Sequence, residues 1–162
     1  MRIVIASVLV LAVAACSPKP AEAPQATAPA APNFAYDIAL SFTPAAAEKV
    51  AKRGDKVTIS ALYYGNPTTA AASEALEDAK DGTIHLNTDL LEVDAKDQTV
   101  HMTGAGAQVP NLQMIVEKKP LVLLNIFATK AGRKDPIIGC GVFQDYVANA
   151  QPKPIAIACD VK

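Results

Sequence analysis

The sequence predicts a mainly β protein: an antiparallel two-layer sandwich of about seven strands, immunoglobulin-like or transthyretin-like, with one short helix. Three observations carry this prediction. Short runs of alternating apolar and polar residues recur through residues 33–162, turn residues separate these runs, and one helical pattern interrupts them. A small closed β-barrel is the alternative architecture.

The first predicted strand leads directly into the predicted helix. Residues 34–42 alternate large apolar with small or polar side chains, which is typical of a half-buried strand. Thr43 and Pro44 then provide an N-cap and a first helical residue. Lys52 and Arg53 stand near the end of a helix of about ten residues, and Gly54 stops it.

Six further runs complete the strand count, at residues 57–63, 83–93, 98–103, 121–128, 137–143 and 155–161. The second and third of these runs flank Asp94-Ala95-Lys96-Asp97, which suits a tight turn, so we expect a hairpin. The fourth run is apolar on both faces apart from Asn125, which predicts a central strand covered on both sides and a buried partner for Asn125. Residues 68–81 predict a loop with a helical turn around residues 73–80.

Residues 1–32 predict export and a tether. Residues 1–15 hold Arg2 and then an unbroken apolar run, the pattern of a signal peptide. This run would cover only about 20 Å as a helix, short of a membrane core of about 30 Å, so a spanning helix is the weaker interpretation. Residues 17–32 hold five prolines and six alanines, which predict an extended tether of at most roughly 50 Å. Residues 33–162 remain as one domain.

The segment Val13-Ala14-Ala15-Cys16 resembles the bacterial lipobox. This resemblance implies that residues 1–15 are removed and that Cys16 becomes the acylated mature N-terminus, an effectively permanent membrane anchor. With Ser17 after the cysteine, it implies the outer membrane, with the domain facing the periplasm. The alternative is ordinary signal peptidase cleavage after Ala15, which also exports the chain. Residues 34–67, with their TPAAAEKV helix and YYGNP ending, are similar to small lipoproteins of Gram-negative bacteria, a resemblance that implies no activity.

Cys140 and Cys159 are predicted to form a disulfide. With Cys16 acylated they are an even pair in an oxidising compartment. Antiparallel strands that place the two cysteines opposite each other also place Ile138 opposite Val161 and Val142 opposite Ile157, which matches apolar residues on one face. Closing a loop of about 20 residues should stabilise the domain by roughly 3 kcal/mol. A redox dithiol is less well supported, because the Cys-x-x-Cys spacing is absent.

The two histidines are the main candidates for a metal site. His85 and His101 lie one on each arm of the expected hairpin, with Met102 close by, and such side chains bind copper in periplasmic proteins. If Thr88 faced Gln98, the histidines would face each other. A tight turn would instead separate them, so two exposed strand histidines are the favoured interpretation.

Two charged clusters are interpreted as solvated surface. One is an acidic group without the regular spacing of a calcium loop: Asp89, Glu92, Asp94 and Asp97. The other is a basic loop that could contact lipopolysaccharide phosphates or an acidic partner: Lys130, Arg133 and Lys134.

Composition and motifs favour a binding or structural module. Without Arg2 the chain has 14 basic against 16 acidic residues, a net charge of −2, which gives nucleic acid no attractive field. It has no Gly-x-Ser-x-Gly, His-Glu-x-x-His or Walker motif, so we expect neither catalysis nor a cofactor. The expected partners are the membrane and another envelope protein. The alternatives are a metal or small-ligand carrier that uses His85 and His101, and a hydrolytic envelope enzyme.

Overall fold

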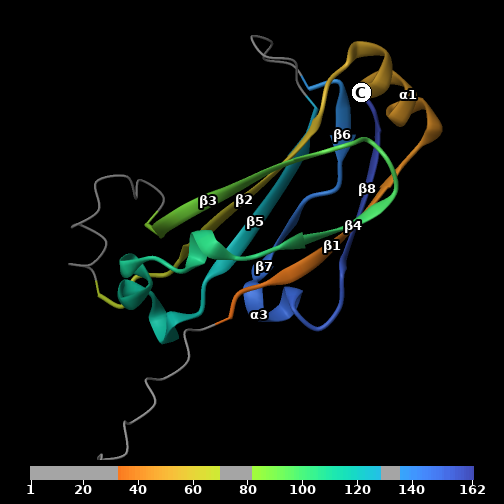
Figure 1. Cartoon of the computed structure of the whole chain (residues 1–162). Coiled ribbons are helices and arrows are strands. Elements are labelled where there is room, and N and C mark those ends of the chain that lie inside the picture. Colours follow the sequence, from red (N-terminus) through yellow and green to blue (C-terminus); the bar gives the residue numbers. More distant parts are fainter. Residues whose placement is uncertain (1–32, 70–81, 129–135) are drawn as a thin grey trace, which may run out of the picture. The chain divides into compact units, whose positions relative to one another are not determined.

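Eight strands form two four-stranded sheets in the computed structural model, which describes residues 33–69, 82–128 and 136–162 (Figure 1). Sheet A has the order β4-β1-β8-β6 and sheet B the order β3-β2-β5-β7. The bounds are β1 (Tyr36–Phe42), β2 (Val57–Gly65), β3 (Ile84–Val93), β4 (Gln98–Met102), β5 (Leu121–Phe127), β6 (Ile138–Cys140), β7 (Phe143–Tyr146) and β8 (Ile155–Val161). The helical turn expected around residues 73–80 lies outside the described residues.

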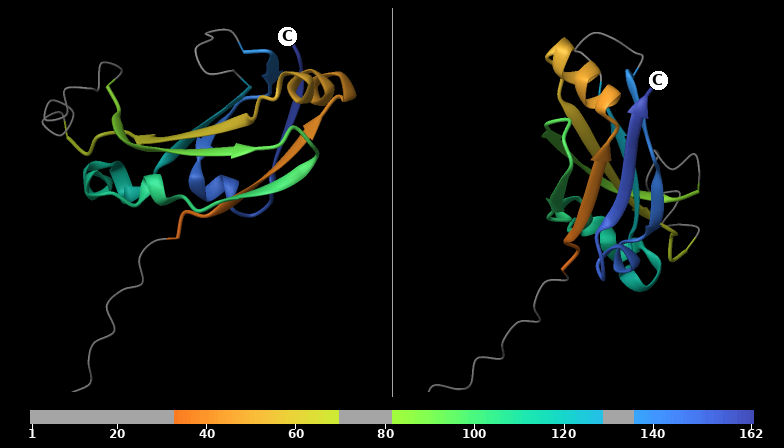
Figure 2. Two further views of the ribbon diagram at one scale, coloured as in Figure 1. Left: turned by 45° about the horizontal axis from the view of Figure 1, so that its top comes forward. Right: turned by 90° about the vertical axis from the view of Figure 1, so that its right-hand side faces the viewer.

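The two sheets pack as the layers of a sandwich (Figure 2). Neighbouring strands are antiparallel except β1 and β8, which are parallel. Among the described residues the strand ladders stay within one sheet or the other, so the predicted sandwich is confirmed and the closed barrel is not formed.

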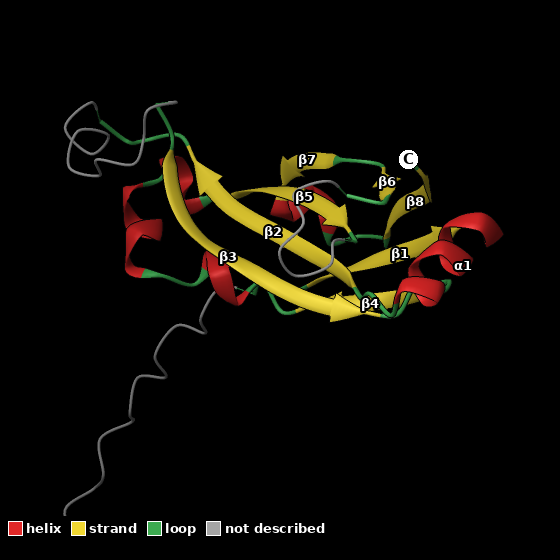
Figure 3. Ribbon diagram, turned by 90° about the horizontal axis from the view of Figure 1, so that it is seen from above, coloured by secondary structure: helices red, strands yellow, loops and turns green. Residues whose placement is uncertain are grey.

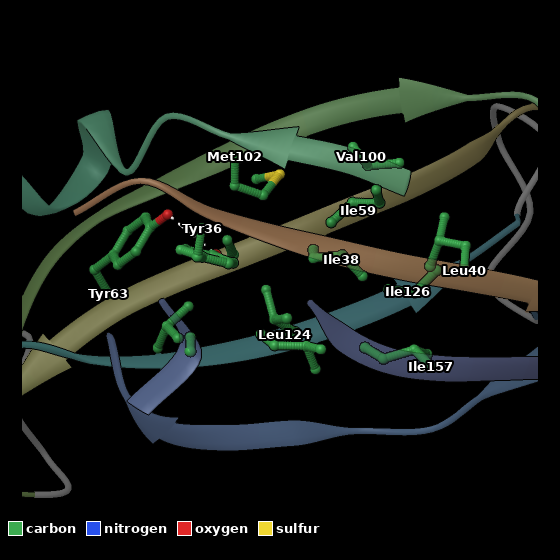
Figure 4. Packing of buried hydrophobic residues seen from close by; sticks show 14 of the residues in the cluster. Tyr36, Ile38, Leu40, Ile59, Tyr63, Val100, Met102, Leu124, Ile126 and Ile157 are labelled. Atoms are coloured by element: carbon green, nitrogen blue, oxygen red, sulfur yellow. Dashed lines mark hydrogen bonds between the residues drawn. The ribbon is translucent and has the colours of Figure 1, made fainter. Parts of the chain in front are cut away.

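The core lies between the sheets because each central strand turns every second side chain inward. Along β2, Val57, Ile59, Ala61 and Tyr63 are fully buried, while the residues between them are only half-buried. Burying an aliphatic side chain of this size contributes about 1.5–3 kcal/mol, so this alternation fixes which face of each strand points inward. Side chains from both sheets meet here, among them Ile38, Leu40, Ile59, Leu124, Ile126 and Ile157 (Figure 4).

Helix α1 (Pro44–Arg53) forms where the sequence predicts it and carries the chain from sheet A to sheet B. The Thr43 hydroxyl accepts the N–H of Ala46 at 3.3 Å, so it caps the first turn. Gly54 ends the helix in the left-handed region at φ 65°, a conformation that costs glycine little. The buried side of the helix is Ala46 and Val50, whereas Glu48 and Lys52 on the opposite side are exposed.

The predicted hairpin of residues 83–93 and 98–103 is wrong. β3 pairs with β2 in sheet B, whereas β4 pairs with β1 in sheet A, so residues 94–97 form a crossover between the layers (Figure 3). Side chains of the crossover hold both sheets: Lys56, just before β2, donates to Asp94 at 2.5 Å, and the N–H of Phe42 in β1 donates to Asp97 at 2.8 Å. These contacts join residues that are distant in sequence.

β5 is covered on one face only, which corrects the prediction of a strand buried on both sides. Val122, Leu124 and Ile126 point into the core, but Leu121, Leu123 and Phe127 are only half-buried on the opposite face. Asn125 shares this outer face and is exposed, so it needs no buried partner. The strand is central within its sheet, yet no third layer among the described residues covers it.

The strand predicted over residues 137–143 is divided between the sheets. β6 ends at Cys140 in sheet A and β7 begins at Phe143 in sheet B. Ile138 faces Val161 and Cys140 faces Cys159 as predicted, but Val142 does not pair with Ile157, because the chain crosses between the layers there. Val142 is consequently 68% exposed.

Short helical turns close the end of the sandwich at which β1 begins. They are η1 (Ala105–Ala107), η2 (Pro110–Met114), η3 (Val116–Lys118) and α3 (Val147–Ala150). Ile115, between η2 and η3, is buried and bridges to Pro67, which holds this segment against the end of β2.

Candidate functional site

Several residues predicted to act in this protein lie outside the described part of the chain. These are the lipobox cysteine and the basic loop: Cys16, Lys130, Arg133 and Lys134. The signal peptide and the tether lie outside it as well. The membrane anchor and the contact through the basic loop stay predictions. No helix among the described residues is long and apolar enough to cross a bilayer.

The two histidines are not brought together. His85 lies on β3 in sheet B, where its ring meets Tyr64 edge-on at 6.4 Å between centroids. His101 lies on β4 in sheet A, and its Nδ1 is 2.8 Å from an Asp37 carboxylate oxygen. Met102 points into the core. In the described part of the chain no three His, Cys, Asp or Glu side chains are placed to hold a metal ion together.

The predicted disulfide is present between Cys140 and Cys159. It joins β6 to β8 where the two cysteines face each other across the ladder, and Cys159 is fully buried. The bond fastens the C-terminal strand to the short strand that precedes the crossing between sheets. Both cysteines pack against the core and belong to the β6–β8 ladder, as is typical of a disulfide with a structural role.

An interior polar cluster was not predicted from the sequence. The hydroxyls of Tyr36 and Tyr63 share a hydrogen bond of 3.2 Å inside the core, one from each sheet (Figure 4). Asp89 faces inward beside Tyr63 and accepts the N–H of Gly106 at 2.9 Å. Its second oxygen is buried and accepts no hydrogen bond from the described residues. Asp89 therefore belongs to the packing of η1 against β3, and not to a solvated acidic turn.

The cluster changes how its tyrosines ionise. Burial raises the pKa of Tyr36 to about 12. The hydrogen bond to Tyr63 lowers this pKa, but by less than burial raises it. Burial also raises the pKa of Tyr63, and the nearby Tyr36 and Asp89 raise it further. Both phenols are therefore neutral at physiological pH. The cluster acts as a polar joint between the sheets.

A shallow groove opens between the edge strands β3 and β4. Its volume is about 260 Å³, and its lining mixes polar and apolar side chains: Thr88, Asp89, Leu90, Leu91, His101, Met102 and Thr103. His101 contacts Asp37 at its rim, and the buried oxygen of Asp89 faces away from solvent. The groove therefore exposes threonine hydroxyls and two leucines, while the buried oxygen of the Asp89 carboxylate is out of reach of a ligand in the groove.

The outer face of sheet B carries a row of apolar side chains that do not belong to the core. β2 and β5 pair so that Leu62 faces Leu123 and Tyr64 faces Leu121 across the ladder. Phe127 extends this row along β5, and Leu90 extends it onto β3, where it is 68% exposed. We call these side chains the outer band: Leu62, Tyr64, Leu90, Leu121, Leu123 and Phe127.

The outer band is uncharged along both of its central strands. The other outward residues of β2 and β5 are hydroxyl or amide side chains: Thr58, Ser60 and Asn125. Gln144 of β7 borders the band and donates to the Tyr64 hydroxyl at 2.5 Å. Along these two strands the polar groups are hydroxyls and amides, while His85 and Glu92 stand beside them on the edge strand β3. The band itself offers apolar area to another protein.

The chain matches no protein-family model, no curated protein and no solved structure at a significant level. The geometry of its surfaces, together with the anchor predicted from residues 13–16, therefore provides the basis for a proposal of function.

Proposed function

We propose that this protein is a lipid-anchored binding module of the bacterial cell envelope, which contacts another envelope protein through the outer band. The observation that carries the proposal is the apolar outer face of two central strands. Leu62, Leu121 and Leu123 contribute little to the core, yet they stand together where polar residues would be expected. An uncharged apolar patch on a sheet face is typical of a protein contact.

The size of the face suits a transient contact. The four strands of sheet B have 10, 9, 7 and 4 residues. At about 3.3 Å per residue and about 4.8 Å between strands, their face covers roughly 480 Å². Each partner in a standard stable complex buries about 800 Å², so this face supplies about half of that area. A permanent lipid anchor on Cys16 would compensate by keeping the domain close to other envelope proteins.

The His85 and His101 carrier and the hydrolytic enzyme gain no support. The histidines lie on different sheets, and the groove between β3 and β4 holds one histidine, which is engaged with Asp37. The anchor would hold the domain on the outer membrane, facing the periplasm. The domain would act there by keeping a partner protein close to the membrane.

Site-specific photocrosslinking in the native cell envelope tests the outer band. A photoreactive residue at Leu123 is expected to give one discrete crosslinked product, and the same residue at Val161 is the control, because Val161 is exposed but belongs to sheet A. Adding Leu62→Gln beside the probe should reduce the yield at least about fivefold, since a buried amide without a partner costs about 1–3 kcal/mol.

Two results would contradict the proposal. One is that the probes at positions 123 and 161 give the same crosslinked products in the same yield, which would mean that the domain meets its neighbours by random collision. The other is a product at position 123 whose yield is unchanged by Leu62→Gln while the variant keeps the wild-type melting temperature, which would mean that the outer band does not form the contact.

A further inference from the structure

One end of the domain gathers basic, apolar and aromatic side chains around the residue where the tether joins it. We call this set the tip: Val116, Lys118, Lys119 and Tyr146. Val116 is 46% exposed and Tyr146 is 40% exposed, and both lysines are exposed. Lys119 and Tyr146 line two adjoining hollows of about 170 Å³ and about 80 Å³, and Asn33 lines the smaller one.

The backbone of the tip is strained. Glu117 and Lys118 both have φ 54°, in the left-handed region that L-residues with side chains rarely adopt. Two contacts with the rest of the domain hold this turn in place. Ile115 is buried, and the N–H of Val116 donates to the carbonyl of Asn66 at 3.0 Å. The turn is thus held in a costly conformation that keeps Val116 and Lys118 in solvent, and such strain points to a function.

The tether joins the domain at the same end. Gln151 donates to the carbonyl oxygens of Asn33 and Ala35 at 2.8 Å and 3.1 Å, so the start of the domain is tied to the turn before β8. Residues 17–32 separate Asn33 from Cys16, a span of at most about 50 Å. Lys153, two residues beyond Gln151, is exposed as well. The tip is therefore the part of the domain next to the tether.

We propose that the tip docks on anionic phospholipid headgroups of the membrane that holds the anchor. This inference rests on the proposed lipid anchor but not on the outer band. Lysines next to a membrane are attracted to anionic headgroups, and each one changes the docked fraction about fivefold, from roughly 1 kcal/mol. Tyrosine and short apolar side chains, such as Tyr146 and Val116, are favoured at the depth of the lipid headgroups. The ion pair of Glu117 with Lys119 leaves Lys118 as the net positive charge of the tip.

Tryptophan fluorescence of the acylated protein tests the docking, because the natural chain contains no tryptophan. Val116→Trp places one reporter in the tip, and Val161→Trp is the matched control, a valine of similar exposure at the end of β8, opposite to the start of β1. Both proteins are purified from membranes and reconstituted in vesicles of phosphatidylethanolamine and phosphatidylglycerol with brominated acyl chains. We expect strong quenching at position 116 and little at position 161.

Charge reversal at the tip provides the second arm. Lys118→Glu with Lys119→Glu should lower docking at least 25-fold and remove the quenching at position 116. Lys52→Glu with Lys96→Glu makes the same change in net charge away from the tip, at two exposed lysines, and should leave the quenching unchanged. Vesicles of phosphatidylcholine alone should give weak quenching at position 116.

Each contrary result has a distinct meaning. Acylated protein that floats with the vesicles but shows equal quenching at positions 116 and 161 overturns the docking and leaves the anchor intact. Quenching that survives charge reversal or is equal on phosphatidylcholine overturns the role of anionic headgroups. If the intact mass of the protein purified from membranes shows no acyl chains, both the anchor and the docking are overturned.

Discussion

The interior tyrosine pair makes a quantitative prediction about stability in alkali. Tyr36 has a pKa of about 12 in the folded protein, against 10.0 for an ordinary tyrosine. The folded state therefore keeps the proton to higher pH than the unfolded chain does. The stabilisation from this group is complete below pH 10 and is lost as the pH rises toward 12.

The expected loss follows from the two pKa values. Between pH 8 and pH 11 the Tyr36 group alone lowers the free energy of unfolding by about 1.4 kcal/mol. Tyr63, whose pKa is raised further by burial, changes stability with the same sign. Tyr36→Phe should therefore show a smaller loss between these pH values. At pH 8 it should be less stable by about 1 kcal/mol, because Tyr63 loses its hydrogen-bond partner.

Urea unfolding at the two pH values measures this difference. The comparison includes Tyr146→Phe as a control, because Tyr146 is 40% exposed and lies outside the core. Ionisation of lysines in this range affects all three proteins and cancels in the comparison. If Tyr36→Phe loses as much stability between pH 8 and pH 11 as the wild type, the buried pair does not govern the alkaline transition and the reasoning is refuted.

Two further perturbations test the joints of the sandwich. Cys140→Ala with Cys159→Ala should lower stability by roughly 3 kcal/mol, since the bond closes a loop over a separation of 19 residues, and calorimetry should record a melting temperature lower by about 10 °C; an unchanged value would show that the ladder alone holds β6 to β8. Thr43→Ala should cost about 1 kcal/mol, because the Thr43 hydroxyl both caps α1 and donates to Asp160 at 2.7 Å. The same bond is the main cause that lowers the pKa of Asp160, so an NMR titration should find that pKa higher in Thr43→Ala than in the wild type; an equal pKa in both proteins would exclude the bond in solution.

The local elements of this domain can be predicted from neighbouring residues along the chain. The alternation in β1 and β2 predicted their buried faces, and Thr43, Pro44 and Gly54 predicted both ends of α1, because each signal depends on residues that are neighbours along the chain. The pairing of Cys140 with Cys159 was also predictable, since two facing cysteines agree with the apolar pattern of their strands.

Which strands are neighbours depends on contacts between distant parts of the chain. Asp94 and Asp97 suit a tight hairpin turn, but their contacts with Lys56 and Phe42 make a crossover that no local pattern encodes. The apolar residues of β5 predicted burial on both faces, and whether a second layer exists there depends on the whole chain.

The candidate surfaces therefore emerged from the fold. Leu62 and Leu123 become one patch only through the β2–β5 register. Asn33 and Lys119 line one hollow only because β1 begins beside the turns that close the sandwich. Sequence periodicity reports which side of a strand is apolar. What lies against that side is set by long-range packing, where the summed burial of many side chains outweighs any local preference.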